Sequence, residues 1–223
     1  MRVSRVQAEK NRLAVIDAAA RLFRERGFNG IGLDEVMKAA GLTHGGFYKQ
    51  FKSKEELTVE ACDRALATGA EVWAQTVKSA GADPFAALIR SYLSSSHRDD
   101  GGKGCPLVAL GADAARHSPT LRRSFEAGIK AYLDVLDRTM PAVSAAAARD
   151  SSIAVLSMMI GALLMSRVVE DRALSRRILD AAARSLLAPA RAATRRNVRT
   201  GRVNKQRDQG GRPRNPSNHA KGA

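Results

Sequence analysis

The stretch that decides the fold is Gly27–Leu57, GFNGIGLDEVMKAAGLTHGGFYKQFKSKEEL. It predicts two short helices joined by a tight turn, and then the start of a longer helix. The first short helix is expected at residues 33–40, because apolar residues recur there at helical spacing. Gly41 should end it, since glycine just past the last apolar residue is the commonest helix end. Thr43 is placed to N-cap the second helix, at residues 44–51.

Two helices joined in this way are typical of a helix-turn-helix, which sets its second helix in the major groove of DNA. Hydroxyls and cations on the outward face suit phosphates and base edges, and glycines let the backbone approach closely. The alternative is a helical hairpin with a solvated face. The candidate DNA-binding residues are Gly32, Thr43, His44, Gly45, Gly46, Phe47, Tyr48, Lys49 and Lys54.

These residues closely resemble the DNA-binding domain of the tetracycline-repressor (TetR) family of bacterial regulators. The resemblance covers about residues 9–57. The chain departs from the family pattern at Ile31-Gly32, where hydroxyl residues are usual, and at Met37, where alanine is usual. The residues that match the family pattern are Phe23, Gly27, Ala40-Gly41-Leu42-Thr43, Gly45, Tyr48, Phe51, Lys54 and Leu57.

Composition predicts an all-α protein. The 223 residues are 44% hydrophobic and rich in Ala, Leu and Arg, and alternating runs of Val, Ile and Thr are absent. We expect about nine helices: a three-helix head, a long connecting helix and a larger helical body. The predicted domains are a DNA-binding domain at 1–56, with its motif at about 32–51, an effector-binding and dimerisation domain at 57–188, and a disordered tail at 189–223.

The formal net charge of +15 is unevenly distributed. Residues 1–56 contain 11 Lys and Arg against 7 Asp and Glu, and residues 57–188 contain 16 against 14. Residues 189–223 contain 10 against 1 and no aromatic residue, so this tail cannot bury enough surface to fold alone. Such a tail either adds non-specific affinity for phosphates or is a solvated extension without a role.

The body is expected to begin with a helix at 54–78, followed by helices at 84–96, from Pro106, and at 120–140. Cys105, at a helix N-terminus where the dipole lowers a thiol pKa, has two interpretations. It is either a small apolar plug or a pocket-lining thiol that senses oxidants or electrophiles. The candidate residues of the effector pocket are Trp73, Cys105, Leu110, Phe125, Ile129, Met158 and Met159.

Residues 153–169 are the most apolar segment and predict a helix buried nearly all round, since 17 residues that include Arg167 are unsuitable for a membrane span. A last helix is expected at 173–187. Two such helices from each of two chains suit a four-helix bundle, and in TetR-like proteins the last two long helices form the dimer interface. The candidate interface residues are Leu156, Ile160, Leu164, Leu174, Ile178 and Leu186.

No catalytic or metal-binding pattern is found in the sequence. The four histidines are scattered, the two cysteines have no metal-ligand spacing, and no phosphate-binding glycine loop is present, so we expect neither enzyme activity nor a cofactor. No signal peptide is found, which makes the cytoplasm the expected location. The resemblance implies a dimeric repressor that binds a palindromic operator and is released by a small-molecule effector. The alternatives are a constitutive dimeric regulator without an effector and a non-specific basic nucleic-acid binder.

Overall fold

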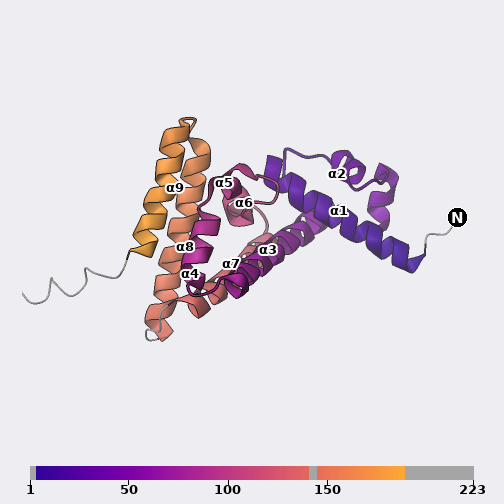
Figure 1. Ribbon diagram of the computed structural model, residues 1–223. Coiled ribbons are helices and arrows are strands. Elements are labelled where there is room, and N and C mark those ends of the chain that lie inside the picture. The colour runs from indigo at the N-terminus through magenta and orange to yellow at the C-terminus, as the bar shows by residue number, and fades with distance from the viewer. Residues whose placement is uncertain (1–3, 141–144, 189–223) are drawn as a thin grey trace, which may run out of the picture. The chain divides into compact units, whose positions relative to one another are not determined.

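The computed structural model describes residues 4–140 and 145–188, and within these ranges every regular element is a helix (Figure 1). The predicted all-α fold is therefore confirmed. The described helices are α1 (Arg5–Arg26), α2 (Leu33–Ala39), the 3-10 helix η1 (His44–Lys49), α3 (Lys54–Ser79), α4 (Pro84–Tyr92), α5 (Ser95–Asp99), α6 (Pro106–Ala115), α7 (Pro119–Thr139), α8 (Ala145–Val168) and α9 (Arg172–Leu187).

The head consists of α1, α2 and η1 around an aromatic core. Phe23 of α1, Phe47 of η1 and Phe51 are almost fully buried, and the last two rings stack with centroids 5.5 Å apart. Arg12 lies over the Phe51 ring, 4.6 Å from its centroid, and forms an ion pair with Glu60 of α3. Leu13 of α1 lies on the outer side of the head and is 46% exposed.

The turn of the motif is set by Gly41, which has a φ of +72°. The Gly41 N–H donates to the Lys38 carbonyl (3.0 Å) and the Leu42 N–H donates to the Met37 carbonyl (2.9 Å). This pair of bonds is the Schellman motif, which satisfies the last carbonyls of a helix and favours glycine at the left-handed position. The predicted end of the first short helix is therefore confirmed, within one residue.

The second short helix is a 3-10 helix of six residues rather than the expected α-helix at 44–51. Gly45 and Gly46 weaken an α-helix, because glycine costs about 1 kcal/mol per residue relative to alanine. Thr43 occupies the N-cap position as predicted, but its side chain makes no capping hydrogen bond.

Helix α3 links the head to the body. The Ser53 hydroxyl caps it by accepting from the Glu56 N–H (3.1 Å), while the Glu56 carboxylate accepts from the N–H of Lys52 (2.6 Å). The helix packs along α1 at its start and along α7 further on. Val72 of α3 is 56% exposed, whereas Trp73 beside it is buried.

The single helix predicted at residues 84–96 is divided into α4 and α5. Ser94 causes the break, because its hydroxyl accepts from the His97 N–H (3.1 Å) and caps α5. Serine side chains offer the backbone such local alternatives to a continuous helix. The loop after α5 then leads to α6.

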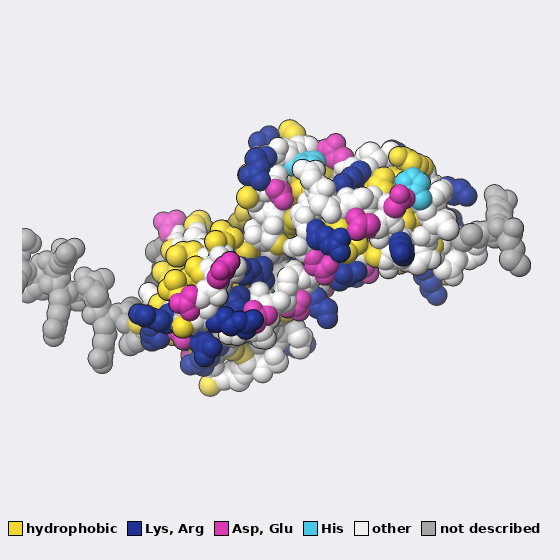
Figure 2. Space-filling model, turned by 90° about the horizontal axis from the view of Figure 1, so that it is seen from above, with side chains coloured by type: hydrophobic (Ala, Val, Ile, Leu, Met, Phe, Trp, Pro, Cys, Tyr) yellow, Lys and Arg dark blue, Asp and Glu magenta, His cyan; other side chains and the backbone are white. Residues whose placement is uncertain are grey.

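The prediction that α8 is buried nearly all round is wrong. Its window at residues 149–168 is long and apolar enough for a membrane span by length and composition, and 39% of it is buried. Core helices of soluble proteins also meet this test, and α8 packs on α7 and α9. Figure 2 shows hydrophobic side chains gathered on the side where α8 and α9 lie. The large exposed apolar residues of α8 are Ile153, Met158, Leu164, Met165 and Val168.

Replacement of Gly128 by alanine should destabilise the protein. A Cβ at Gly128 of α7 would lie 2.7–3.0 Å from three atoms of the Leu66 side chain, and such overpacking costs about 1–3 kcal/mol. Gly111→Ala in α6 is the matched control, because a Cβ there meets nothing within 4 Å and alanine favours the helix by about 1 kcal/mol. Thermal unfolding of both variants checks this; equal effects would contradict the close contact.

Candidate DNA-binding surface and body cavity

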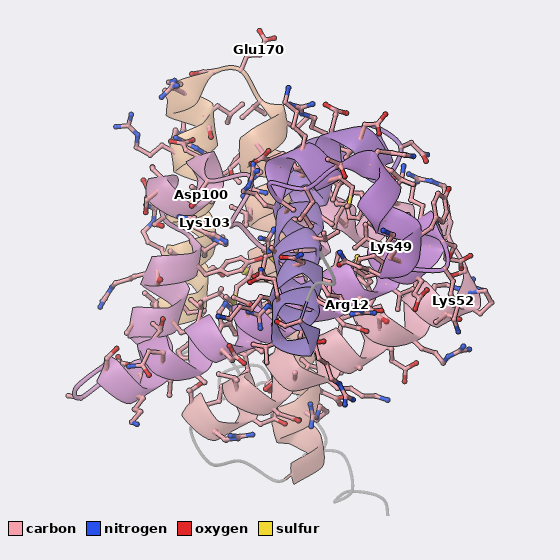
Figure 3. The ribbon with its side chains drawn as sticks, turned by 90° about the vertical axis from the view of Figure 1, so that its right-hand side faces the viewer. Arg12, Lys49, Lys52, Asp100, Lys103 and Glu170 are labelled. Carbon is pink, nitrogen blue, oxygen red and sulfur yellow. The ribbon has the colours of Figure 1, made fainter. Side chains whose placement is uncertain are left out.

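The predicted DNA-binding residues lie mostly on one exposed surface formed by η1 and the turn before it. Thr43, His44, Gly45 and Lys49 are exposed, and the Tyr48 side chain is 68% exposed. A Cβ at Gly45 would meet nothing within 4 Å, so the fold itself does not require a glycine there. Figure 3 shows Lys49 and Lys52 on the head. We call the exposed residues of η1 and of the turn before it, Thr43, His44, Gly45, Tyr48 and Lys49, the η1 surface.

Two residues predicted to contact DNA interact with the rest of the head instead. Phe47 is fully buried in the head core, so it cannot touch DNA and only holds η1 in place. The Lys54 ammonium donates to the Ile31 carbonyl (2.7 Å), which ties the start of α3 to the residue before α2. Gly32 is exposed, and its N–H donates to the carboxylate of Glu35 (3.2 Å), so the entry to α2 is closed by a side chain of the same helix.

His44 has a partner that the sequence did not predict. Its Nδ1 forms a contact with the carboxylate of Asp34 on α2, and both side chains are more than half exposed. The carboxylate brings a negative charge to the η1 surface. His44 must therefore give up or share this contact before it reaches a phosphate or a base edge.

A cavity of about 240 Å³ lies in the body, between the C-terminal part of α1, α3, α4, α6 and α7. Three aromatic side chains form its wall. The Trp73 ring lies 4.7 Å from that of Tyr132 and 5.4 Å from that of Tyr92, centroid to centroid, with both contacts edge-to-face. The other lining residues are Arg24, Ala65, Thr68, Gly69, Val72, His97, Lys103, Gly104, Cys105 and Pro106.

Two polar groups of this cavity are buried without a hydrogen-bond partner. They are the Nε of Arg24 and the hydroxyl of Tyr92. The Cys105 thiol is close to the Tyr92 hydroxyl, but a thiol is a weak partner, so we count the hydroxyl as unsatisfied. Burial lowers the pKa of Arg24 and raises that of Tyr92. Because buried polar groups are normally paired, each of these is a candidate ligand contact.

Helix α5 and the loop after it are held by hydrogen bonds to the start of α6 and to α8. The Cys105 N–H donates to His97 Nε2 (3.1 Å), so Nδ1 carries the proton and donates to the Tyr92 carbonyl (2.7 Å). Burial lowers the pKa of His97, which favours this neutral form. Arg167 of α8 donates to the carbonyls of His97 (3.0 Å) and Arg98 (2.9 Å). The cavity wall is therefore bonded directly to α8.

The expectation of an acidic thiol at Cys105 is wrong. Cys105 is the N-cap of α6 as predicted, but it is 6% exposed and burial raises its pKa. A buried thiol with a raised pKa holds little thiolate, the form that reacts with oxidants and electrophiles. Cys105 is a small residue buried at the edge of the core and also lines the cavity, so the apolar-plug interpretation and the pocket-lining position are compatible.

The predicted pocket residues do not share one cavity. Trp73 and Cys105 line the cavity described above, whereas Phe125 and Ile129 line a separate groove of about 580 Å³ formed by α6, α7 and Ile160 of α8. Leu110 and Met159 are fully buried in the core, and Met158 is 41% exposed on α8. Four residues that line the cavity were not predicted from the sequence: Arg24, Tyr92, His97 and Tyr132. For Arg24, the available signal was its position directly after the buried Phe23.

The predicted dimer residues also divide. Leu156 is 5% exposed and packs within its own body, so it is unavailable to a partner. Leu164 and Leu174 are 47% and 44% exposed. Ile160, Ile178 and Leu186 are half-buried against the core. Among the described residues, no group of His, Cys, Asp and Glu is arranged to hold a metal ion.

Comparison with known proteins identifies both parts of the chain. Residues 15–61 match the sequence family described as "Bacterial regulatory proteins, tetR family", and residues 81–184 match "Transcriptional regulator LmrA/YxaF-like, C-terminal domain". The HTH-type transcriptional regulator LmrA of Bacillus subtilis is 25% identical over 72% of this chain and 88% of its own length. The HTH-type transcriptional repressor NemR of Escherichia coli is 27% identical over 52% of this chain and 60% of its own.

Solved structures share the fold. The reduced form of Escherichia coli NemR superposes with a TM-score of 0.67 at 20% identity, covering 81% of this chain and 99% of that one. A transcriptional regulator from Chloroflexus aurantiacus gives the same TM-score at 24% identity, covering 80% of this chain and 93% of that one. At these identities the likeness establishes the arrangement of helices.

Replacement of Lys49 by methionine should weaken DNA binding by a similar factor for every sequence. An exposed lysine that neutralises one phosphate contributes about one unit to the slope of log K against log salt concentration. Lys78→Met, at the far end of α3, is the matched control and should leave the slope unchanged. Fluorescence anisotropy across salt concentrations measures both; an unchanged slope for Lys49→Met would remove this residue from the interface.

Proposed function

We propose that this chain, which belongs to the tetR family of bacterial regulatory proteins and is a DNA-binding transcriptional regulator, is a repressor released from a palindromic operator by a small-molecule effector. The observation that supports it most is the combination of an exposed η1 surface with a partly polar cavity on the same contiguous core. We place its action in the cytoplasm, where the operator lies.

The η1 surface is our proposed reader of DNA. Tyr48 and Lys49 are exposed donors on it, and Thr43 adds a hydroxyl at the start of η1. Each half-site then receives one head. Two heads on one face of the duplex read half-sites one helical turn apart, about 34–36 Å.

We propose that two chains dimerise through α8 and α9, which would hold the two heads at this spacing. An exposed apolar face runs along α8 through Ile153, Leu164, Met165 and Val168, and Leu174 extends it onto α9. Contiguous apolar surface of this kind usually marks a protein interface. The two helices from each of two chains would form a four-helix bundle that buries it.

Helix α6 offers a mechanical route from the cavity to the head. Its N-terminus, at Cys105 and Pro106, lines the cavity. Residues at and after its other end contact the segment that follows α1: the rings of His117 and Phe28 lie 5.5 Å apart, and a Cβ at Gly27 would lie 3.2 Å from Asp113 Oδ2. A ligand that displaces α6 would therefore move the head, and by reciprocity DNA would weaken ligand binding by the same factor.

Replacement of Leu164 by glutamate should dissociate the dimer. A carboxylate buried in an apolar interface without a partner costs several kcal/mol, so the dimer dissociation constant should rise on the order of 100-fold or more. Leu13→Glu is the matched control, because Leu13 on α1 is 46% exposed and Leu164 is 47% exposed. Sedimentation equilibrium of both variants decides the matter. A dimeric Leu164→Glu protein would place the interface elsewhere.

Specific operator binding is tested by comparing the DNA upstream of its own gene with a scrambled fragment. The full chain and residues 1–189 should both prefer the upstream fragment by about 10³-fold, the range of specific binders. The basic tail lies outside the described residues, and its removal should lower only the salt dependence. Equal affinity for both fragments, lost on removal of the tail, would instead support a non-specific basic binder.

A further inference from the structure

We propose that the body cavity binds an aromatic anion, whose negative charge is held by Arg24 of α1 and whose ring lies against Trp73, Tyr92 and Tyr132. This inference rests on the proposed function, because it names the chemical class of the effector. Arg24 comes from the first helix of the head and not from the body, so the ligand's charge would be bound directly by the part of the chain that carries the η1 surface.

The charged residues around the cavity favour an anionic ligand. Its described lining contains Arg24, Lys103 and His97 but no Asp or Glu. Arg24 forms no ion pair with any described carboxylate, and its Nε is buried without a hydrogen bond. Asp100 is the nearest acidic influence, but it acts only at a distance, and it accepts from the Lys103 N–H (3.0 Å; Figure 3). A half-buried arginine whose Nε has no partner and which has no carboxylate beside it is unfavourable, and an anionic ligand would compensate it.

Further donors converge on the same space. Tyr92 is 3% exposed and its hydroxyl has no hydrogen-bond partner, so the hydroxyl can donate to a ligand oxygen. The N-terminus of α6, a helix of ten residues, begins at the cavity with Cys105 and Pro106. The Cys105 N–H is already bonded to His97, but the positive end of the helix dipole favours a negative charge near such an end. An arginine, a hydroxyl and a helix N-terminus together suit a carboxylate or phenolate.

The rest of the cavity selects an aromatic body. Tyr132 and Tyr92 each meet Trp73 edge-to-face, so three aromatic rings line the cavity. A Cβ at Gly69 would lie 1.9 Å from the Tyr132 hydroxyl, so the glycine is what allows this ring to reach the cavity. An engineered apolar cavity of about 150 Å³ in another protein holds benzene, and the cavity of this chain is larger, at about 240 Å³. One- or two-ring acids therefore fit its size.

Matched pairs of probes test the charge directly. Isothermal titration calorimetry of the full chain, without DNA, would compare benzoate with benzamide and 2-naphthoate with 2-naphthamide. At least one acid should bind on the order of tenfold or more tighter than its amide, the size expected of a charged hydrogen bond. Because Trp73 is the only tryptophan and lines the cavity, a change in its fluorescence reports binding beside it.

Arg24→Met should weaken binding of the acid about tenfold or more and leave the amide within about twofold. It should also raise the melting temperature without ligand, because it removes a half-buried cation whose Nε has no partner. Arg122→Met, an exposed arginine of α7 that lines the separate groove, is the control and should change neither quantity. Tyr92→Phe gives a second test, with a smaller loss for the acid.

The outcomes separate this inference from the proposed function. Acids that bind no tighter than their amides, or equal losses for both probes in Arg24→Met, would overturn the aromatic-anion site. If operator binding is then released by a neutral molecule, the repressor function stands and only its ligand class changes. Acids that bind through Arg24 but leave the operator complex intact would support the site and contradict effector release.

Discussion

Helix α3 contributes to the cores of both the head and the body, and the rest of the structure depends on this sharing. Leu57, near its start, is buried among the head helices, and Trp73, more than four turns later, forms part of the wall of the body cavity. The buried apolar residues of head and body accordingly form one continuous cluster. Close-packed interiors are not continuously deformable, so a change at the cavity cannot be absorbed locally. It must displace a packed element, and the head is attached to the same elements.

Two other connections strengthen this coupling and differ in chemistry. Arg12 binds Glu60 and covers Phe51, which fixes the start of α1 to α3 through charge and an aromatic face. Arg24, near the other end of α1, has no such partner and faces the cavity instead. One helix thus carries a satisfied arginine at a structural contact and an unsatisfied one at a cavity. The contrast is why we assign a ligand role to Arg24.

Helix α5 and the loop after it join the cavity to the α8–α9 side of the body. Arg167 donates to the carbonyls of His97 and Arg98 in α5, and Arg98 donates to the Ser175 hydroxyl of α9 (2.9 Å). Ser175 in turn donates to the Ser166 carbonyl (2.6 Å), which fixes α9 to α8. A dimer built on α8 and α9 would therefore hold the cavity loop as well as the heads. Ligand binding and head spacing then become properties of the dimer rather than of one chain.

The sequence by itself determined the local features: the helical class, the Gly41 turn and the η1 surface residues that carry the family pattern. These depend on residues close together in the chain, and propensity and capping act over that range. Only the tertiary structure decided which side chains meet. It buried Phe47 and Leu156, left α8 with an open apolar face, and brought Arg24 to Tyr92 across 68 positions. Helical periodicity places a residue on a face, but packing of distant helices decides what that face contacts.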